Sequence, residues 1–118
     1  MSPESIIIYH NPRCGKSRLT LQILRERGFE PKIVEYLKAP PSAKVLTDLL
    51  AKLGLEPRQL LRKGEPEYKA AGLDDPKLSA AKLIAAMVAH PILIERPIVV
   101  KGKRAALGRP PEAVLNIL

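Results

Sequence analysis

The segment IIIYHNPRCGKSR, residues 6–18, decides how this chain folds. Its four leading apolar residues, Ile6–Tyr9, predict a short buried strand. The asparagine and proline that follow favour a turn. From about residue 16 to residue 27 the apolar spacing becomes helical, and Gly28 is a typical helix stop. The segment therefore predicts a strand, a tight loop that contains Cys14, and a helix.

The helix and the next apolar run complete a β-α-β unit. Leu19, Ile23 and Leu24 share one face of the predicted helix, and we expect this face to pack inward. Residues 32–37 (KIVEYL) predict a second strand. Two strands joined by a helix are parallel, with a right-handed crossover.

The rest of the chain predicts a block of helices, then a hairpin and a last helix. The expected ranges are 42–54, 57–61, 79–90, 98–100, 104–107 and 110–118, with short turns and helical pieces over 65–78. In the first of these helices, Val45 belongs to the apolar face that we expect to be buried. The order predicts an α/β, thioredoxin-like fold in a single domain over residues 1–118. Its four-stranded mixed sheet would carry a helical insertion between the β-α-β and β-β-α halves.

Composition narrows the class of protein. The chain has 118 residues with a net charge of +8, and aromatics make up only 3% of it, so the core must be aliphatic. A basic balance favours anionic partners, but the four aromatic residues are too scattered to stack bases, and we expect no nucleic acid as partner. No apolar run approaches the ~20 residues that span a bilayer, and the first residues lack the features of a signal peptide. We therefore expect a protein of the cytoplasm with no membrane partner. We also expect a monomer.

Cys14 is the only cysteine, and its surroundings favour a reactive thiolate. A group at the start of a helix faces free backbone N–H donors and the positive end of the helix dipole, and both stabilise an anion. Arg13, Lys16 and Arg18 add positive charge nearby in the sequence. A buried structural cysteine is the alternative, but the polar, loop-like sequence around Cys14 argues against it.

Two other residues of the loop bear on the chemistry. Ser17 stands where a dithiol C-x-x-C protein has its second cysteine, so a resolving thiol would have to come from outside. His10 could assist proton transfer or orient the loop, and a purely structural hydrogen bond to the backbone is an equally open role. One cysteine and two histidines do not show metal-ligand spacing, so we expect no metal.

Four sequence blocks together resemble the ArsC family of glutaredoxin-coupled arsenate reductases, which has a thioredoxin-like fold. In order along the chain they are YHNPRC followed by SR (9–14, 17–18), LLRK (60–63), HPILIERPIVV (90–100) and GRPP (108–111). They occur in the family's order and at similar spacing over almost the entire chain.

The resemblance implies roles for particular residues. Cys14 matches the catalytic cysteine, and Arg62, Arg96 and Arg109 match three arginines that bind the arsenic oxyanion. Pro97 matches a cis proline. His10, Asn11, Ser17 and Arg18 would support the thiol loop. Two further arginines, Arg58 and Arg104, lie outside the matched positions, and we expect them to be solvated.

The implied reaction is the reduction of arsenate to arsenite. Arginine supplies the planar, permanently charged donors that an oxyanion requires. Arsenate would form an adduct with the Cys14 thiolate, which glutathione reduces, and glutaredoxin would clear the mixed disulfide. Glutathione is thus expected as a co-substrate, with no bound cofactor.

Two other functions stay open at this point. The first is a glutathione-dependent thiol oxidoreductase that acts on another oxidised substrate. The second is an Spx-like regulator that binds RNA polymerase. Ser17 interrupts the C-x-x-C pair that redox-sensing regulators of this kind use, and the three arginines favour a site for a small anion.

Overall fold

The computed structural model describes residues 5–118, which divide into two compact units. The first unit comprises residues 5–39 and 96–118, and the second comprises residues 40–95. The predicted helical insertion therefore forms a compact unit of its own. That residues 1–118 make a single domain stays a prediction.

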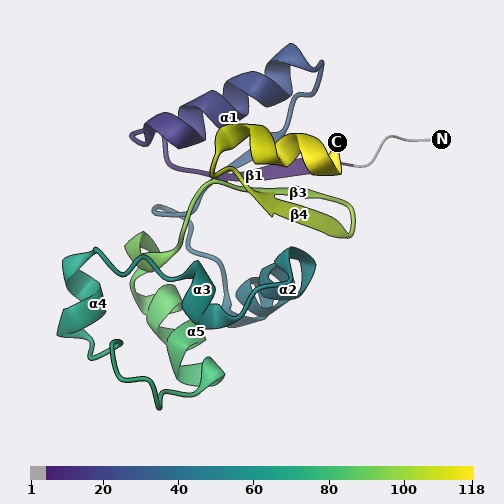
Figure 1. Ribbon diagram of the computed structural model, residues 1–118. Coiled ribbons are helices and arrows are strands. Elements are labelled where there is room, and N and C mark those ends of the chain that lie inside the picture. The colour runs from purple at the N-terminus through teal and green to yellow at the C-terminus, as the bar shows by residue number, and fades with distance from the viewer. Residues whose placement is uncertain (1–4) are drawn as a thin grey trace. The chain divides into compact units, whose positions relative to one another are not determined.

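The first unit is a four-stranded mixed sheet with helices (Figure 1). Its elements are β1 (Ile6–His10), α1 (Gly15–Glu26), β2 (Lys32–Glu35), β3 (Ile98–Lys101), β4 (Arg104–Leu107) and the 3₁₀-helix η2 (Pro111–Ile117). The strand order is β2-β1-β3-β4, in which β1 and β2 are parallel and β3 is antiparallel to both of its neighbours. The predicted β-α-β unit, the hairpin and the mixed sheet are all confirmed.

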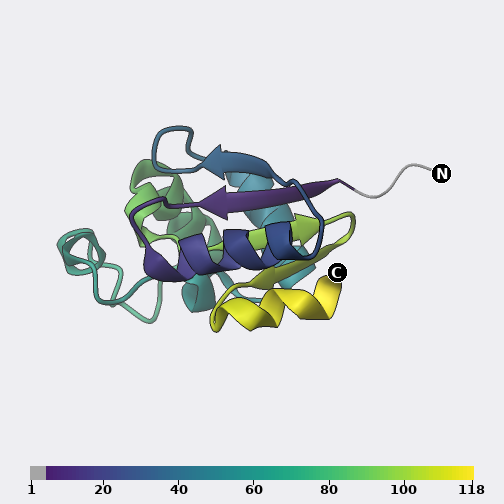
Figure 2. The same cartoon turned by 90° about the horizontal axis from the view of Figure 1, so that it is seen from above.

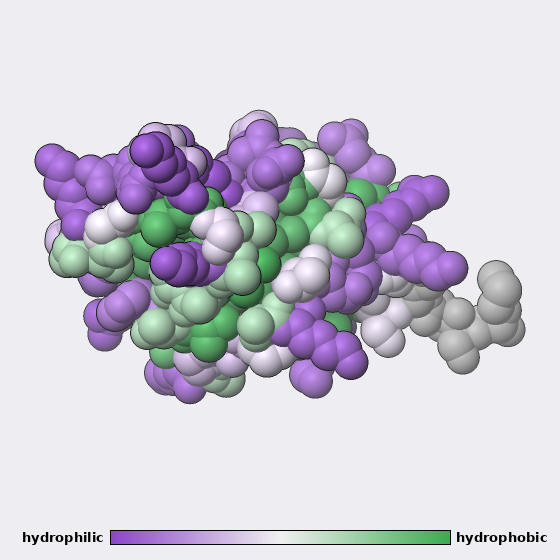
Figure 3. Space-filling model, turned by 90° about the horizontal axis from the view of Figure 1, so that it is seen from below, coloured by the Kyte–Doolittle hydropathy of each residue, from purple (hydrophilic) through white to green (hydrophobic). Residues whose placement is uncertain are grey.

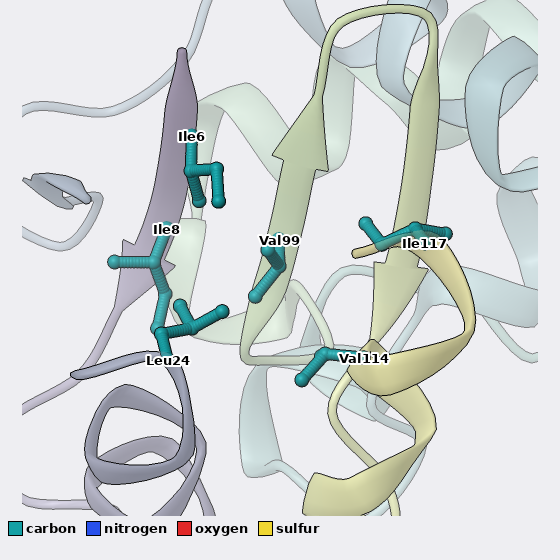
Figure 4. Packing of buried hydrophobic residues seen from close by; sticks show 6 residues of the cluster. All are labelled: Ile6, Ile8, Leu24, Val99, Val114 and Ile117. Atoms are coloured by element: carbon teal, nitrogen blue, oxygen red, sulfur yellow. The ribbon is translucent and has the colours of Figure 1, made fainter. Parts of the chain in front are cut away.

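The core of the first unit lies between the sheet and two helices. Helices α1 and η2 cover the same face of the sheet, as Figure 2 shows from above. Six buried aliphatic side chains fill the space between them, and Figure 4 shows how they converge. They are Ile6, Ile8, Leu24, Val99, Val114 and Ile117. This packing fixes α1, and with it the start of α1, on the central strand β1.

One expectation about α1 is wrong. Leu19 was predicted to face inward, but 52% of its surface is exposed. The buried positions of α1 are Ser17, Thr20 and Leu24, which lie three and four residues apart on one face. Leu19 lies two residues from Ser17 and therefore on the opposite side of the helix. Small polar side chains replace an apolar stripe at the end of α1 nearest Cys14, so apolar spacing alone misplaced the buried face.

Gly108 holds the end of β4 close to α1. A Cβ atom at this position would lie 2.5 Å from Thr20 Oγ1 and 2.7 Å from Pro97 Cγ. The Gly108 N–H donates to the carbonyl oxygen of Pro97 at 2.9 Å. Only glycine allows the chain before Arg109 to approach both groups this closely.

The second unit consists of helices and turns. Its elements are α2 (Ala43–Leu53), α3 (Pro57–Leu60), α4 (Pro66–Ala70), α5 (Ala80–Ala89) and the 3₁₀-helix η1 (Pro91–Leu93). The hydroxyl groups of Ser42 and Ser79 cap α2 and α5 by accepting backbone N–H bonds of 3.2 Å. Val45 is exposed, contrary to expectation, because α2 buries its face through Leu46, Leu49 and Leu50.

Apolar surface remains on the second unit. Alanine side chains of α5 line a shallow hollow of about 440 Å³. Figure 3 shows apolar side chains gathered in the middle of the face seen from below, with hydrophilic side chains around them.

No helix in residues 5–118 is long and apolar enough to cross a membrane.

Arg58 is not solvated, which corrects the expectation from the sequence. It is half-buried in the second unit, and its Nη1 donates to Tyr68 Oη at 3.0 Å and to the carbonyl oxygen of Leu73 at 2.7 Å. Its Nη2 donates to the carbonyl oxygen of Asp75 at 2.8 Å. These bonds hold the irregular segment between α4 and α5, whose backbone has few partners in regular structure. Arg104 is exposed, as expected.

Replacing Gly108 by alanine should cost about 1–3 kcal/mol of unfolding free energy, because the added methyl group overpacks the contact with Thr20 and Pro97. Urea unfolding of the variant measures this cost. Gly64→Ala is the matched control, because a Cβ there meets nothing within 4 Å. Equal stability of the Gly108→Ala variant and the wild type would show that the two segments do not meet as closely as described.

Arg58→Ala should lower the unfolding free energy by about 2 kcal/mol, because it leaves two carbonyl oxygens without their charged donor. Arg104→Ala, which removes an exposed arginine, should change it by less than about 0.5 kcal/mol. Thermal unfolding followed by circular dichroism compares the two variants. Similar losses in both variants would contradict the structural role of Arg58.

Candidate active site

Cys14 occupies the N-cap position of α1. It is half-buried, its backbone is extended (φ −94°, ψ 123°), and its carbonyl oxygen accepts the first helical bond from the Arg18 N–H at 3.0 Å. The N–H groups of the first helical turn have no acceptor within the helix. The first turn also contains no acidic residue, and no side chain caps it. A thiolate on Cys14 would therefore meet backbone donors and the positive end of the helix dipole.

Asn11 shapes the loop that carries the thiol. Its carbonyl oxygen accepts from the Cys14 N–H at 3.0 Å, and its side-chain Oδ1 accepts from the Arg13 N–H at 3.0 Å. Arg18 Nη1 donates to the carbonyl oxygen of Pro12 at 2.9 Å and so ties the loop to α1. The predicted supporting residues Asn11 and Arg18 thus lie where they can fix the loop.

His10 and Ser17 are buried directly behind the loop. His10 Nδ1 and Ser17 Oγ share a hydrogen bond of 2.6 Å, and Ser17 Oγ also accepts from the Asn11 N–H at 3.1 Å. His10 ends β1 and Ser17 lies in the first turn of α1, so this pair joins the strand to the helix on both sides of Cys14. The hydrogen bond of His10 is thus made to the side chain of Ser17 and not to the backbone. This contact fits a residue that orients the loop.

Burial lowers the pKa of His10 below its ordinary value of 6.5. The negative charge of Glu35 opposes this shift, whereas the positive charges of Arg18 and Arg25 add to it. The imidazole therefore favours its neutral form in the folded protein.

Arg96 and Arg109 belong to the C-terminal segment of the first unit and contact each other. Arg109 Nη1 donates to the carbonyl oxygen of Arg96 at 3.3 Å. The Arg96–Pro97 peptide bond is cis, as expected, and the Arg109–Pro110 bond is cis as well, which the sequence did not predict. Nε and Nη1 of Arg96 are buried and have no hydrogen-bond partner among residues 5–118. Buried donors of this kind require an acceptor.

Arg62 lies in the second unit, where two carboxylates face it. Its Nε is 3.2 Å from Glu65 Oε1, and its Nη1 is 3.5 Å from Glu95 Oε1. Sequence reasoning missed both glutamates. Glu65 follows Arg62 by three residues, and this spacing could have predicted the ion pair. Glu95 is distant in sequence and is brought near Arg62 by the bridge that pairs Leu61 with Ile94.

Two grooves border the thiol loop on the first unit. One, of about 590 Å³, is lined by His10, Pro12 and one side of α1 with Arg18 and Arg25. The other, of about 300 Å³, is lined by residues 10–13 and by the end of β2 with Glu35 and Lys38. Within residues 5–118, no group of three or more His, Cys, Asp or Glu side chains is placed to hold a metal ion.

The strand order and the thiol at the start of the first helix define a thioredoxin-like protein with a single cysteine in that helix cap. A model of the ArsC family matches residues 9–117. This chain belongs to the ArsC family, which confirms the resemblance seen in the sequence.

Relatives and solved structures match along nearly the full chain. Uncharacterized protein YfgD of Escherichia coli K12 is 52% identical over 116 residues, and the match spans 98% of this chain and 98% of that protein. Arsenate reductase of the same strain is 48% identical over 98% of this chain and 82% of its own length. The structure of arsenate reductase from Vibrio cholerae superposes with a TM-score of 0.96 and 49% identity, over 99% of this chain and 100% of that one. The predicted fold class is thereby confirmed.

The unfolding free energy of the His10→Gln variant should depend less on pH than that of the wild type. Because the folded pKa of His10 is depressed, the stability contributed by the neutral imidazole is present above 6.5 and is lost as the pH falls toward the folded pKa. The wild type should therefore lose more unfolding free energy than the variant between about pH 7 and about pH 5.

Urea unfolding at both pH values gives the comparison. His90→Gln, which removes the exposed histidine, should keep the wild-type pH dependence. A His10→Gln variant that is as sensitive to acid as the wild type would contradict the burial of a neutral imidazole at this position.

Proposed function

We propose that this protein is an arsenate reductase that works through Cys14 and takes its electrons from glutathione, with glutaredoxin as the partner that regenerates the thiol. The observation that carries the proposal is the guanidinium of Arg96, whose buried Nε and Nη1 have no acceptor among the described residues. An oxyanion supplies the acceptor oxygens that such a group requires. Because the chain is 48–49% identical in sequence to proteins named arsenate reductase, we take this oxyanion to be arsenate.

Cys14 is the nucleophile in this proposal. Its thiolate attacks the arsenic atom, an S–As bond forms, and one arsenate oxygen leaves as water after taking up protons. Arsenic remains As(V) in the adduct. The N–H groups at the start of α1 stabilise the thiolate, and the bonds made by Asn11 and Ser17 keep the loop in position for attack.

The arginines neutralise the oxyanion. Arg96 and Arg109 are neighbours in the first unit, and the contact from Arg109 Nη1 to the Arg96 carbonyl oxygen fixes one relative to the other. Gly108 and cis Pro97 set the backbone from which both side chains leave. Arg62, a residue of the second unit, is added to the proposed set by the family resemblance. Fixed positive charges stabilise the negative charge that builds on the arsenate oxygens during attack.

Reduction then follows from a second thiol, because the chain has only one. The glutathione thiolate attacks the Cys14 sulfur, an S–S bond forms, and the S–As bond breaks with its electron pair left on arsenic. Arsenic is thereby reduced to As(III) and leaves as arsenite. Glutaredoxin attacks the mixed disulfide, takes up the glutathionyl group and returns Cys14 to its thiolate.

Purified protein with arsenate, glutathione and glutaredoxin should produce arsenite, and Cys14→Ser should reduce the rate to the no-enzyme background. Arg96→Lys and Arg109→Lys should each lower kcat/KM by about 100-fold, since a lysine cannot make the bidentate contact. Arg104→Lys, which changes an exposed arginine of β4, should leave kcat/KM unchanged.

The same assay separates the parts of the proposal. Wild-type protein that forms no arsenite above background would overturn the arsenate assignment. Turnover that persists without glutaredoxin at the full rate would overturn the proposed partner. Reduction of a glutathionylated substrate without arsenate turnover would instead favour a thiol oxidoreductase of another specificity.

A further inference from the structure

The guanidinium of Arg62 is held between two carboxylates, and this arrangement has a consequence for the anion that it accepts. We infer that Glu65 and Glu95 select an oxyanion that carries a proton on one of its oxygens, and that they exclude a fully deprotonated dianion of the same shape. The inference rests on the proposed function, in which Arg62 binds the substrate oxyanion.

The backbone of the second unit places the three side chains together. Leu61 and Ile94 form an antiparallel bridge. On its two sides, the Arg62 N–H donates to the carbonyl oxygen of Leu93 at 2.7 Å, and the Glu95 N–H donates to that of Leu60 at 2.8 Å. Both pairing partners of the bridge are buried, so Arg62 and Glu95 are tied to a fixed part of the unit.

The two ion pairs leave part of the arginine available. Glu65 faces Nε at 3.2 Å and Glu95 faces Nη1 at 3.5 Å, and neither ion pair uses Nη2. Nε and Nη1 themselves make no aligned hydrogen bond. The guanidinium therefore retains donors for an oxyanion while it is flanked by two acceptors.

The two carboxylates work against an unprotonated oxygen at this position. The carboxylates of Glu65 and Glu95 flank the guanidinium, and the three side chains are only 22–24% exposed, so solvent screens their charges incompletely. An oxyanion bound to Arg62 comes close to both carboxylates. An unprotonated oxygen facing a carboxylate is repelled, whereas a protonated oxygen donates a hydrogen bond to it.

This arrangement separates oxyanions that size and shape cannot separate. Arsenate and phosphate keep at least one proton near neutral pH, because their last ionisation occurs only in strong base. Sulfate has the same tetrahedral shape but carries no proton at this pH. Discrimination then arises from an unfavourable contact with the wrong anion, and not from a better contact with the right one.

A purely structural role would have a different signature. If the glutamates only anchored Arg62, their replacement by glutamine would weaken the binding of phosphate and sulfate alike. The ratio of the two dissociation constants is therefore the informative quantity, since anchoring does not change it.

Isothermal titration calorimetry of the full chain with phosphate and with sulfate near neutral pH measures this ratio. The wild type should bind phosphate at least about tenfold more tightly than sulfate. In the double variant Glu65→Gln, Glu95→Gln the ratio should approach one, because sulfate binds more tightly once both charges are removed. Each single variant should give an intermediate ratio.

Glu67→Gln is the matched control, because Glu67 is half-buried in the same unit and takes part in none of the ion pairs found in residues 5–118. It should keep the wild-type ratio. Circular dichroism confirms that each variant is folded, and the single variants decide the outcome if the double variant is not.

A wild-type ratio near one, or a double variant that keeps the wild-type ratio, would overturn the inference. These binding measurements do not depend on turnover. Arsenate reduction without discrimination against sulfate would therefore reject the inference and leave the proposed function intact. Binding of neither anion by the wild type would reject the inference, and arsenate turnover would then decide the proposed function separately.

Discussion

The structure of the first unit depends on how the end of β1 is joined to the start of α1. The hydrogen bond of 2.6 Å between His10 and Ser17 closes this junction, and the bonds of Asn11 fold the loop over it. Cys14 consequently lies at the cap of a helix whose first N–H groups have no acceptor within the helix and no side-chain cap. The aliphatic core anchors α1 to the sheet, so the position of the thiol follows from packing that lies well away from it.

Two further contacts position the backbone of Arg96 and Arg109 relative to α1. Thr20, one turn after the thiol loop, lies against Gly108, and Gly108 lies against cis Pro97. Arg96 precedes that proline and Arg109 follows that glycine, so both guanidinium groups leave the backbone from a segment that α1 itself positions. The buried donors of Arg96 are costly without an acceptor, which is a cost that proteins accept at sites that bind a charged ligand.

The sequence predicted the strands, the helices and their order because these depend on local patterns: apolar runs, capping serines and prolines. It also located Cys14 before a helix and, through the family resemblance, the cis bond at Pro97. It failed where distant contacts decide. The inward face of α1 is set by Ser17 and Thr20 and not by Leu19, and Arg58 is fixed by carbonyl groups of a later segment. Glu95 could not be paired with Arg62 from spacing, because a bridge between two remote segments brings them together.

The central claim is that the Cys14 sulfur bonds to arsenic beside fixed guanidinium groups. A crystal structure of the protein soaked with arsenate tests it most directly. We expect an arsenic atom bonded to Sγ of Cys14, with its oxygens hydrogen-bonded to the guanidinium groups of Arg96 and Arg109. An unmodified Cys14 in crystals that hold arsenate elsewhere on the protein would contradict it.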